Sequence, residues 1–79
     1  MRYYFNIDDG ELAFDEEGME FTDFDMVKAE ALQAAGDALK ELENTAIWSG
    51  KTLKIWVTDQ PQGGGNTLLT LLVNARLPA

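Results

Sequence analysis

Residues 22–44, TDFDMVKAEALQAAGDALKELEN, carry the helical period around which the rest of the chain is arranged. Apolar residues recur there every three or four positions, which places a single stripe along one side of an α-helix. The stripe consists of Phe24, Val27, Ala31, Ala35, Ala38 and Leu42, and it is widened by Leu32 and Leu39. Thr22 is the predicted N-cap, because its hydroxyl can accept a free N–H of the first turn. The sequence therefore predicts a helix over 22–44 whose stripe faces a core.

Two strand-like segments precede the helix. Residues 2–8 alternate, with Tyr3, Phe5 and Ile7 on one face, and this period of two is typical of a β-strand. The Asp-Asp-Gly turn that follows predicts a hairpin, with a short return strand over 11–14.

Two more strand-like segments follow the helix. Residues 51–58 alternate, with Leu53, Ile55 and Val57 on one face. A Pro/Gly-rich loop then leads to residues 67–74, which are apolar on both faces. Because 2–8 and 67–74 are the most apolar strands, both are predicted to lie in the centre of the sheet.

The order strand, strand, helix, strand, strand predicts an α+β fold. We expect a two-layer ββαββ domain, in which one helix packs on one face of a four-stranded, mainly antiparallel sheet. Seventy-nine residues suffice for one domain, which is predicted to span 1–79.

The chain is acidic, with fourteen Asp and Glu against six Lys and Arg and a net charge of −8. Nucleic acid and anionic lipid repel such a chain, so neither is predicted as a partner. No apolar run approaches the length of a membrane span, and the strand that begins at Arg2 leaves no room for a signal peptide. The predicted location is therefore the cytoplasm, which also suits a chain without cysteine.

The residue types that form many catalytic and metal sites are missing from the sequence. The sequence has no cysteine and no histidine, which excludes zinc sites of those ligands and Cys/His nucleophilic sites. The acids fall in turns and loops, where solvated carboxylates with ordinary pKa values are poor general acids or bases. The triplet at 63–65 lacks the Lys-Ser/Thr of a phosphate-binding loop. The sequence therefore predicts no enzyme, no catalytic residue and no cofactor.

An acidic cluster surrounds the first predicted hairpin and consists of Asp8, Asp9, Glu11, Asp15, Glu16 and Glu17. Hard cations such as Ca²⁺ prefer oxygen ligands. The spacing does not match the EF-hand loop, so no metal site is predicted.

Three segments resemble a family of short bacterial domains of unknown function. They are RYYFNIDDG at 2–10, DEEGME at 15–20 and the alanine-rich helix from Phe24 to Ala35. Members of that family open with Arg-Tyr-Phe-Phe and an Asp-Gly turn, continue with Asp-x-x-Gly-x-Glu and end with a strand pair around Val-x-Asp, here Val57-Thr58-Asp59. The likeness covers most of residues 2–60, and the glycine triplet departs from it. It implies the fold and a bacterial origin, and no activity.

A second likeness is to the antitoxin half of a bacterial toxin–antitoxin pair with a degraded RNase H-like sheet and one helix. Such antitoxins are small, acidic and often oligomeric, and they cover a basic RNase. The sequence predicts two strands before the helix where these antitoxins have three, and it predicts no DNA-binding extension.

A single helix covers only one face of the predicted sheet, so the other face should be polar. It is instead predicted to carry Tyr4 and Trp56 with one set of the last strand, either Leu69, Leu71 and Val73 or Leu68 and Leu72. Such a patch is typical of an interface, and a homodimer is the expected assembly. The candidate interface residues are Tyr4, Trp56, Leu69 and Leu71. Alternatively, the tail or the 59–66 loop covers this face within one chain.

Three functions remain open on the sequence alone. The first is a small domain that acts through protein–protein contact as a homo-oligomer. The second is an antitoxin-like inhibitor of a basic partner. The third is a small-ligand or metal-binding module built on the acidic hairpin.

Overall fold

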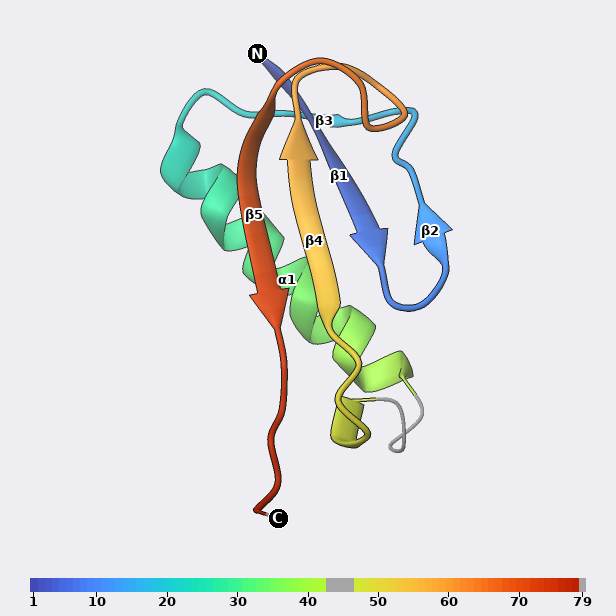
Figure 1. Ribbon diagram of the computed structural model, residues 1–79. Coiled ribbons are helices and arrows are strands. Elements are labelled where there is room, and N and C mark those ends of the chain that lie inside the picture. Colours follow the sequence, from blue (N-terminus) through green and yellow to red (C-terminus); the bar gives the residue numbers. More distant parts are fainter. Residues whose placement is uncertain (43–46, 79) are drawn as a thin grey trace.

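The computed structural model describes residues 1–42 and 47–78 (Figure 1). In these ranges the chain forms, in order, β1 (Arg2–Asp8), β2 (Leu12–Ala13), β3 (Met19–Glu20), α1 (Phe24–Glu41), β4 (Leu53–Thr58) and β5 (Thr67–Val73). The helix lies across one face of an antiparallel sheet, as Figure 1 shows. The predicted α+β, two-layer fold is therefore confirmed, with β3 as an additional two-residue strand.

The described strands pair in the order β2-β1-β4-β5, and each pair is antiparallel. The centre is thus formed by β1 and β4, and β5 lies at the edge. The predicted central position of the last strand is wrong, although its apolar composition suggested it. The buried strand is β4, because it lies between two long neighbours and all of its residues except Lys54 are buried.

The two shortest strands are parts of one interrupted return strand. Both pair with β1, β2 opposite Ile7 and Asp8, and β3 opposite Arg2 and Tyr3. The segment 14–18 bulges out between them, so the pairing is displaced by two residues. This bulge contains Asp15, Glu16 and Glu17 of the acidic cluster, and it shapes the outer face of the sheet.

The helix is shorter than predicted at its start. Its N-cap is Asp23, not Thr22: Asp23 has an extended backbone (φ −138°) and its carboxylate accepts the Asp25 N–H at 2.8 Å. A carboxylate at this end also stabilises the positive end of the helix dipole. The helix ends at Glu41, and residues 43 and 44 of the predicted helix lie outside the described residues.

The core lies between α1 and the sheet in two adjoining clusters. Near the start of the helix, Val27 packs with Tyr3 and Val57. Farther along, Ala35 packs with Leu53 and Ile55. The stripe therefore faces the sheet as predicted, with Val27, Ala31 and Ala35 buried.

Leu32 and Leu39 do not extend the buried stripe, contrary to expectation. Leu32 is 63% exposed and Leu39 is 36% exposed. The narrow sheet explains this result, because β5 is its last strand on that side and nothing described lies beyond it. Within residues 1–42 and 47–78, no helix combines the length and apolar character that a membrane crossing requires.

Candidate functional site

The outer face of the sheet, which points away from α1, holds Trp56 at its centre. Its side chain is only 8% exposed. The Phe14 ring meets it edge-on, with centroids 6.0 Å apart, and the Lys54 ammonium lies 4.6 Å from its ring centroid. Trp56 is therefore covered within one chain.

The bulge at 14–18 is held against the sheet by the Asp15 carboxylate. One oxygen accepts the Phe5 N–H at 3.0 Å, which replaces a strand-to-strand bond that the interrupted return strand does not make. The other accepts the N–H groups of Glu17 and Gly18, each at 3.1 Å. Gly18 has φ +69°, and a Cβ there would lie 2.8 Å from the Tyr4 ring, which accounts for glycine at this position.

These bonds set the ionisation of Asp15. Partial burial by itself would raise its pKa, but the three N–H donors and the charge of Arg2 together hold the pKa below its ordinary value. A lowered folded-state pKa stabilises the fold above the unfolded-state pKa, and that contribution is lost as pH falls through the folded-state pKa. Asp15 is thus a structural carboxylate that stays ionised at neutral pH.

Beneath the bulge lies a buried polar network centred on Asn6, which is fully buried. Its amide donates to the Trp56 carbonyl and to the Thr58 hydroxyl, both at 3.2 Å. Its carbonyl accepts the Asp15 N–H at 3.1 Å. The network joins β1, β4 and the bulge, and its role is structural because all of its groups are satisfied by one another.

The loop that connects β4 to β5 also closes over this region. The Gln62 N–H donates to the Asp15 carbonyl at 3.0 Å, and the Gln62 amide donates to the Glu16 carboxylate at 3.1 Å. Asp59 holds the base of the loop by accepting the Asn66 N–H at 2.8 Å, and bonds from Asn66 lower the pKa of Asp59. The 59–66 loop therefore lies against the bulge whose Phe14 ring covers Trp56, in agreement with the alternative in which this loop helps to cover the outer face.

The four predicted interface residues do not form one surface. Tyr4 and Trp56 lie on the outer face, whereas Leu69 and Leu71 are paired with Val57 and Ile55 and pack toward the helix. The side chains of β5 on the outer face are those of Leu68, Thr70 and Leu72, which include the second of the two predicted sets, Leu68 and Leu72. Leu72 is 61% exposed.

The free edge of β5 is a second candidate surface, and no pattern in the sequence marks it. In the described residues β5 pairs with β4 alone, so its other side presents unpaired backbone groups along seven residues. Between this edge and α1 lies a groove of about 200 Å³ lined by Lys28, Ala31, Leu32, Leu69, Thr70 and Leu71. The relevant pattern in the sequence is that β5 is apolar on both faces. This pattern indicates that both faces are buried, but it does not identify the element or partner that covers them.

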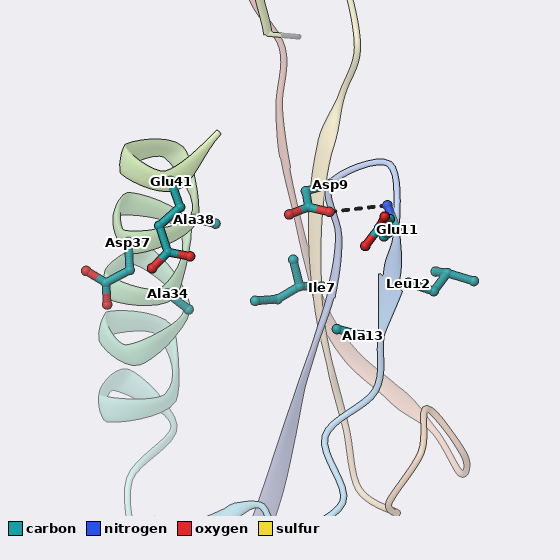
Figure 2. A pocket seen from close by; sticks show the side chains of 9 residues that line it. All are labelled: Ile7, Asp9, Glu11, Leu12, Ala13, Ala34, Asp37, Ala38 and Glu41. Atoms are coloured by element: carbon teal, nitrogen blue, oxygen red, sulfur yellow. Dashed lines mark hydrogen bonds between the residues drawn. The ribbon is translucent and has the colours of Figure 1, made fainter. Parts of the chain in front are cut away.

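A second hollow, the acidic cleft, lies between the end of α1 and the first hairpin (Figure 2). Its volume is about 390 Å³. Asp37 and Glu41 belong to the helix side, and Asp9 and Glu11 belong to the hairpin side. The rest of the lining is apolar: Ile7, Leu12, Ala13, Ala34 and Ala38.

The acidic cleft forms because α1 crosses β4 and β5 and leaves the end of β1 uncovered. The small side chains of Ala34 and Ala38 add to the space opposite Ile7 (Figure 2). No three acidic residues among those described are close enough together to hold a metal ion. The carboxylates are divided between two walls, so the cleft matches an elongated cation with an apolar stem better than a single ion.

The fold and these surfaces define a small two-layer α+β domain in which the seven-residue edge strand β5 pairs, within the described residues, on one side only. A family model matches residues 2–71, and the chain belongs to that family, described as "Domain of unknown function (DUF6894)". No curated protein and no solved structure matches the chain. The predicted resemblance to a family of unknown function is thereby confirmed.

Proposed function

We propose that this domain acts through protein–protein contact and associates with itself into a homodimer. The observation that carries this proposal is the exposed edge of β5. Proteins usually protect such an edge with Lys, Pro, a bulge or a covering loop. The strand TLLTLLV has no charged residue and no proline, and its five aliphatic side chains lie on both faces. Its pairing with β4 is irregular only beside Leu68, close to its first residue.

Several exposed apolar side chains beside that edge support the proposal. Leu72 and Leu68 lie on the outer face, and Leu32 lies beside the groove under β5. A homodimer through this edge would remove them from water together with the unpaired backbone groups. The predicted contact through Trp56 is replaced by a contact through β5, because Trp56 is covered by Phe14.

Size-exclusion chromatography with light scattering tests this function. We expect a mass of twice 8.8 kDa at high protein concentration. The dimer fraction should rise between about 0.05 M and about 0.5 M salt, because salt screens the repulsion between two chains of charge −8. A mass of 8.8 kDa at every concentration and both salt levels would rule out the homodimer.

The acidic cleft favours a second candidate function, recognition of a basic partner protein. Among the described residues, none of its four carboxylates forms an ion pair. An arginine or lysine side chain offers an aliphatic stem for Ile7 and Ala38 and a charged head for the carboxylates. This function is consistent with an inhibitor of a basic protein and does not depend on the homodimer.

Calorimetric titration with the peptide acetyl-Arg-Leu-Arg-Leu-Arg-amide tests the acidic cleft. The double variant Asp37→Asn, Glu41→Gln should weaken binding about tenfold, which corresponds to two partly screened charge contacts. The matched control Glu17→Gln, Glu30→Gln makes the same charge change outside the cleft and should weaken binding less than about twofold. Equal weakening in both variants would mean that only the net charge attracts the peptide.

A further inference from the structure

The sequence of β5 is nearly symmetric about its middle residue, Thr70. Counting outward in both directions, Leu69 corresponds to Leu71 and Leu68 corresponds to Leu72. Such a strand presents the same side chains to a partner when it is read in either direction. This is the pattern that a self-complementary, two-fold contact requires.

We propose that β5 pairs antiparallel with β5 of a second copy, with Thr70 on the two-fold axis, so that two sheets become one continuous sheet. This inference rests on the proposed homodimer and specifies its register. The axis of such a strand pair is perpendicular to the sheet, so both helices lie on the same face. Residues directly opposite one another then point to the same side of the sheet.

The register follows from the length and the side chains of β5. With Thr70 on the axis, all seven residues of each β5 lie opposite the other β5, and the irregularity beside Leu68, where the pairing with β4 skips one residue, falls near the end of this ladder. Leu68 then lies opposite Leu72 on the outer face, and Leu69 lies opposite Leu71 on the helix face. Moving the axis to a neighbouring residue on the same strand would leave two residues of each β5 unpaired.

The side chains near the edge suit this arrangement. Leu32 and the groove beneath β5 lie on the helix face, where the second copy brings its own Leu32 and groove. Directly opposed aliphatic pairs in an antiparallel ladder are stabilising. The contact therefore covers Leu32, which the narrow sheet of a single copy leaves 63% exposed.

The distribution of charge also favours the β5 edge over the other edge of the sheet. Residues 60–79 carry a single charge, that of Arg76. The opposite edge contains the turn with Asp8, Asp9 and Glu11, and the acidic cleft is on that side. Two acidic chains that meet through β5 keep those carboxylates apart, whereas pairing through β2 would bring them together.

A cysteine cross-link tests the register, because the chain has no cysteine of its own. Residues directly opposite in an antiparallel pair have Cα atoms about 4.5 to 5.5 Å apart, which is within the range that a disulfide spans. Thr70→Cys should therefore form a disulfide-linked dimer rapidly under mild oxidation. The control Glu11→Cys, at the other edge, should cross-link at least about tenfold more slowly, because only random collision brings it together.

A charge substitution provides a second measurement. Thr70 is exposed, so Thr70→Lys leaves the monomer folded but places two ammonium groups opposite each other at the axis. The dissociation constant of the dimer should rise by about fivefold or more. Gln33→Lys adds the same charge on the solvent side of α1, away from Val27, Ala31 and Ala35, and should leave the dimer unchanged.

The outcomes separate this inference from the proposed function. A wild-type dimer in which Thr70→Cys cross-links no faster than Glu11→Cys keeps the homodimer and overturns the β5 register. If the wild-type protein is a dimer and Thr70→Lys and Gln33→Lys change its dissociation constant equally, the homodimer also stands and the β5 register is overturned. A wild-type monomer overturns both.

Discussion

Asn6→Ala is expected to lower the free energy of unfolding by about 3 to 5 kcal/mol, from the loss of buried hydrogen bonds and the opening of a void. Asn6 makes three bonds, to the Trp56 carbonyl, the Thr58 hydroxyl and the Asp15 N–H. Its removal takes these three bonds away from buried groups beneath the bulge, and the Thr58 hydroxyl then keeps only its bond to the Gln60 carbonyl at 2.9 Å. A domain of this size has a total stability of only about 4 to 12 kcal/mol, so the loss is a large share of it.

Thermal unfolding followed by circular dichroism measures this effect. The melting temperature should fall by roughly 15 °C or more. Asn66→Ala is the matched control, because the Asn66 amide makes an exposed bond to Asp59 at 3.0 Å, and its loss should cost within about 1 kcal/mol. Asn6→Leu keeps most of the side-chain volume and still loses the hydrogen bonds. It therefore separates the free-energy cost of the lost hydrogen bonds from the cost of the void. If Asn6→Ala melted like Asn66→Ala, the network would contribute nothing to stability.

Ala35→Leu is expected to lower the free energy of unfolding by about 1 to 3 kcal/mol through overpacking. Ala35 is 5% exposed and lies against Leu53 and Ile55, where three additional carbon atoms have no free space. The small side chain is what lets α1 approach β4 closely. Larger side chains at this position must displace the helix or adopt strained rotamers.

Ala29→Leu is the matched control, because Ala29 is exposed on the same helix. Leucine and alanine have similar helix propensities, so the control should change stability by less than about 0.5 kcal/mol. Urea unfolding of both variants gives the comparison. Equal effects of the two substitutions would show that the helix face assigned to the core is wrong.

Local patterns in the sequence predicted most of the elements. The alternation in 2–8 predicted β1 with its correct bounds, and the stripe through Val27, Ala31 and Ala35 identified the buried side of α1. The sequence did not predict how the short strands pair with β1. β3 has only two residues and pairs across a bulge, so no periodic signal marked it.

The candidate surfaces were harder to predict, because they depend on contacts between distant residues. Trp56 was expected on an apolar face, and it is on that face, but the sequence did not show that Phe14 covers it. The predicted central position of β5 was wrong for the same reason. Apolar residues on both faces are typical of a central strand, and they are also typical of an edge strand that binds a partner. The acidic cleft arises from the path of α1 over the sheet, which no local pattern encodes.

The pairing of β1 with β4 has a consequence for how the chain folds. Tyr4 is paired with Thr58, so the two central strands come from opposite ends of the chain. The first hairpin is too short to be stable alone, and a helix such as α1 takes most of its stability from packing its apolar face against the sheet. The native contacts therefore have a high contact order, which slows folding and makes it cooperative. On a ribosome, the sheet can form only after nearly the whole domain has been synthesised and β4 has left the exit tunnel.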